Sequence, residues 1–444
     1  MLHRILPVLC APLAVLAAAD FDPAQGVDAN GRIPKVPLPI TTDHPERYRY
    51  VPEGRIVPGS PIDRAFVSFF PTPIFYYEEA IGAGGGIALV DIDFRNQRRQ
   101  EFLGMFVAAT TEGQETYRVI WQRWLDQHEV PGGGIVQQDR SLMRVETGYE
   151  RTLTRRFFGL GDETNADDET SYTDEVSNAA ASFEHALGAP LDDLVALGGV
   201  NVVHRNLSAG RVVGVPTTGT VFPDLVATSD GRSTAWLFAG LRLDTRDSTE
   251  NPYHGGSLEA RVDYAPFQND GYGAAGTTTL KATWALAIPS LFHDGGLADL
   301  RSTGVAEENP PTDAIVVGAR TQRAWGDMAF PDLPNLGGSN TLRGYIGDRW
   351  TGRSAWNAGI EWRTWVVPRG VAFTRSIRIE RFGIAPFADF GAVSADPAGL
   401  RRADPTWSLG TGLRVAFERD AIFRIDIAKS PEDVGVNVDF GMAF

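Results

Sequence analysis

The sequence predicts an all-β protein, a transmembrane antiparallel β-barrel of sixteen strands. Three observations lead to this prediction. The N-terminus has the form of a secretory signal peptide, the rest of the chain alternates apolar and polar residues with a period of two, and the last apolar face ends on Phe444. No stretch after residue 19 approaches the ~18 apolar residues of a transmembrane helix, so strands must do the crossing.

The predicted signal peptide covers residues 1–19. Arg4 supplies its positive charge, residues 5–16 its apolar core, and three alanines at 17–19 the cleavage site. This core is too short to span a bilayer as a helix. Cys10, the one cysteine of the sequence, lies inside it. We therefore expect an exported mature chain without disulfides or thiolate chemistry.

The composition argues against nucleic acid as a partner, because 56 acidic residues outnumber 41 basic ones and the net charge is −15. Residues 20–62 are rich in proline, glycine and charge but show no periodicity. We interpret them as a periplasmic linker or tail. The barrel domain is predicted over residues 63–444.

The alternation is clearest in the last predicted strand, where Val436, Val438, Phe440, Met442 and Phe444 share one face. The predicted strands run about ten residues, the length that a tilted strand needs to cross hydrocarbon. Such a sheet must close, because an open edge would leave unpaired backbone groups in lipid. Fifteen segments carry the pattern: 82–94, 100–112, 114–128, 139–153, 172–187, 190–206, 232–246, 254–266, 272–289, 312–327, 353–366, 381–394, 406–419, 421–429 and 435–444. Because bacterial barrels have even strand numbers, we expect a sixteenth in 64–80, where Pro71 and Pro73 interrupt the pattern.

A large soluble β-sandwich or solenoid is the alternative to the barrel, and the strand length and terminal phenylalanine count against it.

The connections differ in length, and this difference predicts their side of the membrane. Short connections at 95–99 and 188–190 are expected to be periplasmic turns. The long ones are expected outside, at 154–171, 207–231, 290–311 and 328–352.

One motif resembles a known family. Residues 337–345 read Gly-Gly-Ser-Asn-Thr-Leu-Arg-Gly-Tyr, with Gly337, Gly338, Leu342, Arg343, Gly344 and Tyr345 as its marked positions. This resembles the sixth extracellular loop of the BamA/TamA family of outer-membrane proteins (the bacterial surface antigen family), in which five strands follow the loop, as five predicted segments do here. Further positions resemble the same family, namely Asp244, Arg246, Asp247, Pro252 and Gly255 in a turn, and 357–361 and 387–391 in two strands. Founding members carry POTRA domains before the barrel, and the present sequence resembles the barrel alone.

The resemblance implies that the loop folds into the barrel and that Arg343 pairs with acids on the inner wall. The alternation independently turns Glu361 and Asp389 inward, on consecutive strands where the two carboxylates would lie near one another. A guanidinium between them would relieve their repulsion. The alternative is a solvated Arg343 and acids that line a wet lumen. At the C-terminus, Phe440 and Phe444 are predicted to form the assembly signal.

The sequence offers no clear constellation of residues for enzymatic chemistry. The histidines show no metal-ligand spacing, and Gly84–Gly86 opens a strand, whereas a phosphate-binding loop would open a helix. No Gly-x-Ser-x-Gly motif occurs. The acidic run at 162–169 lacks the glycine and spacing of an EF-hand, which leaves a solvated loop as the preferred interpretation and calcium binding as the alternative. We expect no enzymatic activity, no cofactor and no metal.

The function expected from the resemblance is a role in outer-membrane assembly or in moving protein or lipid, through a weak seam between the first and last strands. Pro71, Pro73 and the glycines of 82–86 make the first strand a poor partner, which favours that seam. The expected partners are outer-membrane lipid, the barrel-assembly machinery during biogenesis, and a client protein or lipid. Two other functions stay open: a passive porin-like channel, and a structural or surface-antigen protein that acts through its outer loops.

Overall fold

The computed structural model of the chain describes residues 38, 40–42, 44–51, 53–56, 69–131, 133–269, 271–295, 309–372, 378–417 and 422–443. The predicted signal peptide, much of the predicted linker at 20–62, and Phe444 lie outside the described residues.

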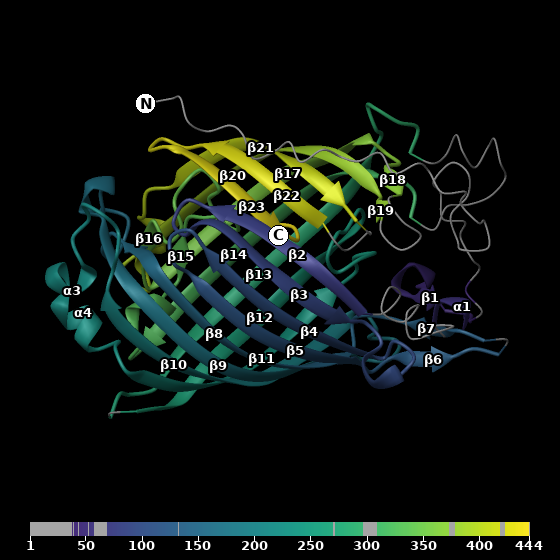
Figure 1. Cartoon of the computed structure of the whole chain (residues 1–444), viewed down its shortest axis with the longest axis horizontal. Coiled ribbons are helices and arrows are strands. Elements are labelled where there is room, and N and C mark those ends of the chain that lie inside the picture. The colour runs from purple at the N-terminus through teal and green to yellow at the C-terminus, as the bar shows by residue number, and fades with distance from the viewer. Residues whose placement is uncertain are drawn as a thin grey trace.

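Sixteen antiparallel strands form one closed barrel, which confirms the predicted fold class (Figure 1). Fifteen of them overlap the fifteen predicted segments, and the sixteenth falls within 64–80 as expected. The strands are β2 (Phe69–Glu78), β3 (Gly82–Asp91), β4 (Glu101–Thr110), β5 (Glu115–Trp124), β8 (Leu142–Phe157), β9 (Thr170–Ala186), β10 (Leu194–Ala209), β11 (Arg232–Asp244), β12 (Gly255–Gln268), β13 (Ala275–Ile288), β14 (Asp313–Gly326), β17 (Ser354–Val367), β20 (Arg381–Ser394), β21 (Thr406–Ala416), β22 (Ile422–Lys429) and β23 (Val434–Phe440). Each strand pairs with its neighbours in chain order, and the ring closes from β23 to β2.

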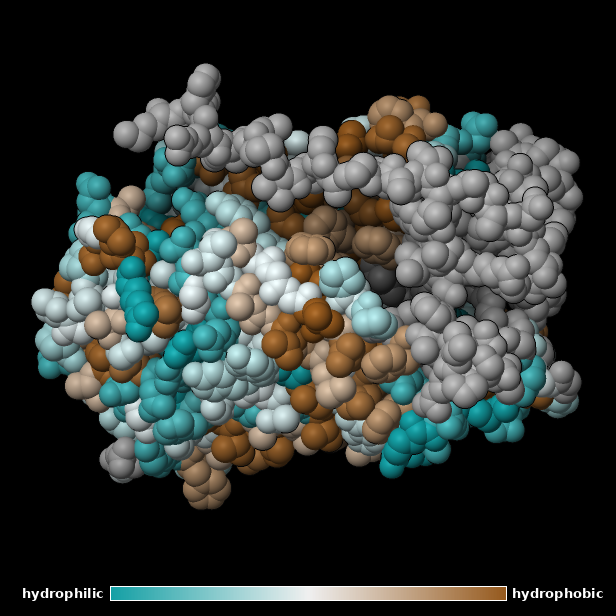
Figure 2. Space-filling model, in the orientation of Figure 1, coloured by the Kyte–Doolittle hydropathy of each residue, from teal (hydrophilic) through white to brown (hydrophobic). Residues whose placement is uncertain are grey.

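The outer face of the barrel is apolar because alternate residues of each strand point outward. Phe75, Leu258 and Trp284 are 64%, 56% and 61% exposed, and similar side chains recur around the strands. Figure 2 shows apolar side chains gathered over the middle of one face, with hydrophilic ones toward the ends of the barrel. A soluble monomer rarely exposes apolar surface on this scale, so the band fits contact with lipid.

The seam between the first and last strands is short. Within the described residues, β2 and β23 share a single register pair, Tyr77 opposite Val438. On its other side β2 pairs with β3 without interruption from Phe69 to Glu78. Pro71 and Pro73 lie within β2 and have no backbone N–H to donate. The closure of the barrel is therefore its weakest strand pairing.

The last strand is shorter than the prediction of 435–444, because β23 ends at Phe440. Gly441 adopts a left-handed backbone conformation with φ of 85°, which turns the chain out of the strand. Met442, predicted on the lipid face, packs against a buried cluster that includes Trp365. The prediction of one continuous face to the C-terminus was wrong at this point, since alternation alone does not reveal where a glycine turns the backbone.

The two ends of the barrel carry different elements (Figure 1). One end, here called the loop end, carries α3 (Thr218–Val221) and α4 (Pro223–Ala227), together with β15 (Asn335–Leu336) and β16 (Trp350–Thr351). The other, called the turn end, carries β1 (Arg49–Val51), α1 (Glu53–Ile56), β6 (Gln127–Glu129), β7 (Ile135–Gln137), β18 (Val371–Ala372) and β19 (Arg378–Ile379). Among the described residues, no helix has both the length and the hydropathy to cross a membrane.

One long connection is on the opposite end from that predicted. Connections alternate between the ends because each strand reverses the direction of the one before it. The connection at 290–311 joins β13 to β14, and this alternation places its described ends, 290–295 and 309–311, at the turn end with 95–99 and 188–190. The connections at 154–171, 207–231 and 328–352 meet at the loop end. Length was a poor guide to the side of 290–311, whereas the strand count decides it.

Part of the segment predicted as a linker docks at the turn end. Its strand β1 pairs with β7, which pairs with β6, and the three form a small sheet. Arg98 donates to Glu53 at 2.7 Å, and Glu53 also accepts the backbone N–H of Gly134 at 2.7 Å. These bonds lower the pKa of Glu53 below its usual range. The described part of the predicted linker is thus held by strand pairing and charge.

Candidate functional site

The motif at 337–345 lies in the connection between β14 and β17, where β15 and β16 pair to form the base of an inserted loop. We call residues 327–353 the inserted loop. Leu342 and Arg343 are 0% exposed and Tyr345 is 4% exposed, so the tip is buried although it belongs to a connection. The alternative of a solvated Arg343 does not describe this structure.

Glycines allow the inserted loop to turn and to approach the wall. Gly337 and Gly338 adopt φ of 119° and 81°, a region that side chains with a β carbon rarely adopt. Thr341 closes this turn, because its hydroxyl accepts from the N–H of Gly337 at 2.8 Å and donates to the carbonyl of the same residue at 2.9 Å. A β carbon on Gly344 would lie 2.9 Å from that of Ser408. The spacing of glycines in the motif thus serves tight backbone geometry.

Arg343 lies between the two acids that the sequence turned inward. Its Nε and Nη2 donate to the two oxygens of Asp389 at 2.9 and 2.8 Å, and its Nη1 donates to Glu361 at 2.8 Å. The guanidinium carbon also lies 3.3 Å from the centre of the Phe387 ring. Asp389 and Glu361 come from β20 and β17, which are paired neighbours. Every nitrogen of the guanidinium therefore has a charged acceptor.

The site is larger than these three residues. Arg363 donates to Glu361 at 3.1 Å, and Arg414 donates to the same carboxylate at 2.9 Å. Arg414 also donates to Asp426 at 2.6 Å, and Arg424 donates to Asp426 at 3.2 Å. We call the resulting set the arginine cluster: Arg343, Arg363, Arg414, Arg424, Glu361, Asp389 and Asp426. All seven are buried, so the charges stabilise one another with little help from bulk water.

The sequence interpretation missed four members of the cluster, namely Arg363, Arg414, Arg424 and Asp426. Their signal was present, because each lies on the inward face of a strand whose outward face is apolar. What the sequence alone could not supply is the relative register of the strands that brings Arg414 to Glu361. Because this register also brings Arg414 to Glu361, that carboxylate would keep two cations, Arg363 and Arg414, even without Arg343.

Apolar contacts hold the other side of the tip. Leu336, Leu342, Tyr345 and Trp350 form a buried cluster with Val393 of β20. The rings of Tyr345 and Trp350 meet edge to face with centroids 4.5 Å apart. The aromatic residue that ends the motif thus anchors the inserted loop to the wall by packing.

The inserted loop contacts both strands of the seam from inside. On the β23 side, Asn437 donates to the carbonyl of Arg343 at 3.0 Å, and Ser339 donates to Asp439 at 3.1 Å. On the β2 side, Glu78 lies so close that a β carbon on Gly347 would be 2.6 Å from its carboxylate oxygen. The loop therefore bridges the two strands that pair at one position.

The turn after β11, the eighth strand of the barrel, is built on the acids noted in the sequence. Arg246 donates to both oxygens of the fully buried Asp244, at 2.9 and 2.7 Å. Asp247 accepts the backbone N–H of Tyr253 at 3.0 Å. Gly255 has φ of 89°, which starts β12. These residues have a structural role in the turn.

Of the predicted assembly signal, Phe440 is described and Phe444 is not. Phe440 is 45% exposed on the outer face, and its ring lies 5.2 Å from that of Phe423 on β22. The placement agrees with an outward aromatic at the end of the last strand. Its role in assembly stays a prediction.

Within the described ranges, one group of three side chains has donor atoms close enough to hold a metal ion: His44, Asp192 and Asp193 at the turn end. Arg47 forms ion pairs with both aspartates, so a cation already occupies this position. The acids of 162–169 do not converge in this way. The geometry thus gives no support to the calcium alternative at that loop.

No protein-family model matches the sequence, and a search of curated proteins found no match. Among solved structures, the chain is similar to BamA from Haemophilus ducreyi lacking POTRA domains 1–3, with a TM-score of 0.49, 13% identity, and coverage of 84% of this chain and 71% of that one. It is similar to CdiB from Acinetobacter baumannii, with a TM-score of 0.48, 11% identity, and coverage of 84% and 59% respectively. It also matches Wzi, an outer-membrane carbohydrate-binding β-barrel involved in group 1 capsule assembly in Escherichia coli, with a TM-score of 0.31, 9% identity, and coverage of 85% and 82%.

Proposed function

We propose that this protein is an outer-membrane barrel of the BamA/TamA type, whose seam opens sideways during membrane assembly or the movement of protein or lipid. The observation that carries the proposal is the single register pair between β2 and β23. Strand edges without partners can template another strand, and β2 and β23 are joined at one register pair. A client strand, or a lipid entering between the strands, would replace a pairing that costs little to lose.

The inserted loop supports this proposal because it contacts both sides of the seam. Asn437 and Asp439 tie it to β23, and Glu78 packs against it from β2. A loop held in this position can keep the seam closed when the arginine cluster is intact, and it can follow one strand when the other moves away.

The location and partners follow from the same features. The apolar outer band needs lipid, and the predicted signal peptide would deliver the chain across the inner membrane. The outward Phe440 at the end of β23 would be read by the barrel-assembly machinery during biogenesis. The client would be a protein or lipid. We propose no enzymatic step, no cofactor and no nucleic-acid partner.

The test is to lock the seam. Replacing Tyr77 and Val438 by cysteine places two thiols at paired positions, and the mature chain contributes no thiol of its own. The matched control is Ile87→Cys with Val107→Cys, a register pair between β3 and β4 on the same outer face. Each variant is reconstituted in phospholipid vesicles, reduced or oxidised. The measurements are the folding rate of an added unfolded barrel protein and the transfer of fluorescent phospholipid between leaflets.

Oxidation of the seam variant should stop its stimulation of barrel-protein folding or of phospholipid transfer. Oxidation of the Ile87/Val107 control variant should leave the same activity unchanged. Equal activity of the oxidised and reduced seam variant would contradict lateral opening. Ion conductance, measured in the same preparations, addresses the porin-like alternative. A steady conductance that is unchanged when the seam is locked, with neither folding nor lipid transfer stimulated, would favour a passive channel.

A further inference from the structure

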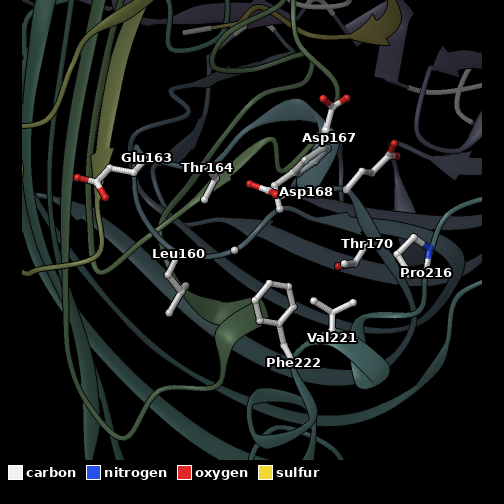
Figure 3. Close-up of a pocket in the computed structure, with 12 residues that line it drawn as sticks. Leu160, Glu163, Thr164, Asp167, Asp168, Thr170, Pro216, Val221 and Phe222 are labelled. Atoms are coloured by element: carbon white, nitrogen blue, oxygen red, sulfur yellow. The ribbon is translucent and has the colours of Figure 1, made fainter.

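A hollow of about 500 Å³ lies at the loop end, outside the arginine cluster (Figure 3). Its walls come from the connection between β8 and β9 and from the connection that contains α3. Leu160, Val221 and Phe222 are apolar members of the lining, and Figure 3 shows them grouped on one side of it. The hollow is thus an apolar depression between two surface connections.

Acidic side chains surround this apolar floor. Glu163, Asp167, Asp168 and Glu169 belong to the lining, and the lining includes no basic residue. Glu169 is paired with Arg156 at 2.7 Å, and Asp168 accepts the backbone N–H of Asn165 at 2.9 Å.

The remaining two carboxylates are available to a ligand. Glu163 and Asp167 are exposed, and neither has a bonding partner among the residues that the structure describes. Figure 3 places both at the rim, extending away from the floor. Negative charge at the rim and apolar surface at the floor are complementary to an apolar group that has positive charge on either side of it.

The shape favours a peptide over a small molecule. Leu160 and Val221 are 37% and 47% exposed, so the floor is shallow. Small-molecule sites usually enclose 70–90% of their ligand, which a floor this open cannot do. A side chain that projects from a larger partner is covered from above by the partner itself. A metal ion is a poor occupant, because the carboxylates do not converge within the described part of the chain.

The hollow is held in shape by the inserted loop. Arg349 donates to the carbonyl of Thr164 at 3.0 Å and to its hydroxyl at 3.2 Å. The same guanidinium lies 4.7 Å from the ring of Phe158, which also lines the hollow. Glu432 fixes Arg349 with two bonds of 2.7 Å. The walls are therefore preorganised, which lowers the cost of binding.

We propose that this hollow binds a peptide segment in which an apolar residue is flanked by lysine or arginine. The apolar side chain enters between Leu160, Val221 and Phe222, and the flanking cations meet Glu163 and Asp167. The site lies at the loop end and is complete in the closed barrel, so binding there needs no opening of the seam.

The test uses the full mature chain refolded in detergent micelles and three fluorescent peptides. They carry the cores Lys-Phe-Lys, Lys-Gly-Lys and Glu-Phe-Glu, and binding is followed by anisotropy at low salt. The variant Glu163→Gln with Asp167→Asn removes the two free charges. Its control, Glu112→Gln with Asp404→Asn, removes two exposed acids that do not line the hollow. Leu160→Ser tests the floor.

Lys-Phe-Lys should bind best, and its affinity should fall about three- to tenfold in the Glu163/Asp167 variant, as expected for two exposed ion pairs. Leu160→Ser should weaken it as well, while the control variant should bind like wild type. Equal binding of Lys-Gly-Lys, or an unchanged affinity in the Glu163/Asp167 variant, would overturn the proposal. Binding of calcium ions, added as calcium chloride, to wild type but not to the Glu163/Asp167 variant, with no peptide binding to either, would overturn the proposal in favour of a metal site.

Discussion

Removing Arg343 should leave its two acidic partners, Glu361 and Asp389, with unequal numbers of charged partners. In Arg343→Ala, Glu361 keeps its bonds from Arg363 and Arg414, so it stays neutralised. Asp389 loses both charged bonds, at 2.9 and 2.8 Å. One uncompensated buried carboxylate costs about 3–5 kcal/mol, and we expect this loss of stability in the variant.

A second substitution, added to Arg343→Ala, shows which of the two carboxylates has lost its compensating charge. Adding Asp389→Asn removes the stranded charge and should recover part of the loss. Adding Glu361→Gln should make matters worse, because it leaves Arg363 and Arg414 with one carboxylate fewer. A lysine at position 343 should rescue only in part, since it cannot bridge two carboxylates with a planar fork.

The assay is the temperature at which the compact, fast-migrating form is lost on gels, together with protease cleavage within the inserted loop. Arg343→Ala should lower the midpoint and expose the loop to protease. If Arg343→Ala equals wild type in both measurements, the loop is not held by this cluster. If Asp389→Asn and Glu361→Gln rescue Arg343→Ala equally, the distribution of charge described above is incorrect.

Three further predictions concern other parts of the chain. Gly337→Ala should destabilise the inserted loop by roughly 1–3 kcal/mol, because the backbone is strained and the new β carbon would lie 2.2 Å from the carbonyl oxygen of Ile346. Its control is Gly214→Ala, which is also at positive φ but has no neighbours within 4 Å and should show backbone strain alone in the same gel assay. The pKa of Glu53 is lowered in the folded protein, so its contribution to docking is present above the unfolded pKa of about 4.5 and is lost as the pH falls through the lower folded pKa. Protease access to residues 44–56 should therefore rise in acid, and Glu53→Gln should abolish this dependence on pH. Phe440→Asp should reduce outer-membrane levels without blocking export, because it places a charge on the lipid face, and normal levels in fractionated cells would argue against an assembly role.

Much of the fold could be predicted because the exterior of a barrel imposes a simple rule on the sequence. Lipid on one side of every strand forces alternation, and the thickness of hydrocarbon forces strand length. The rule stops where lipid stops, which explains the two errors: Gly441 turns the chain before the predicted end of the last strand, and 290–311 was assigned a side by its length.

The site was predictable in part for a related reason. Alternation turned Glu361 and Asp389 inward, and the motif supplied Arg343. The contact of Arg414 with Glu361 depends on the register of strands separated by about fifty residues, which a single sequence does not encode locally. The docking of residues 49–51 on β7 has the same character, since three residues carry too little pattern to reveal a partner.

The arginine cluster also bears on the order of folding. All of its members come from residues 343–426, whereas β2 and β3 lie far away in sequence. Contacts between nearby residues form with less loss of chain entropy than contacts between distant ones. We therefore expect the C-terminal third to fold first around the inserted loop, with the remaining strands added afterwards toward the N-terminus. On heating, the β2 and β23 edges should separate before the cluster melts, so unfolding should begin at the seam and proceed through an intermediate that retains the last five strands.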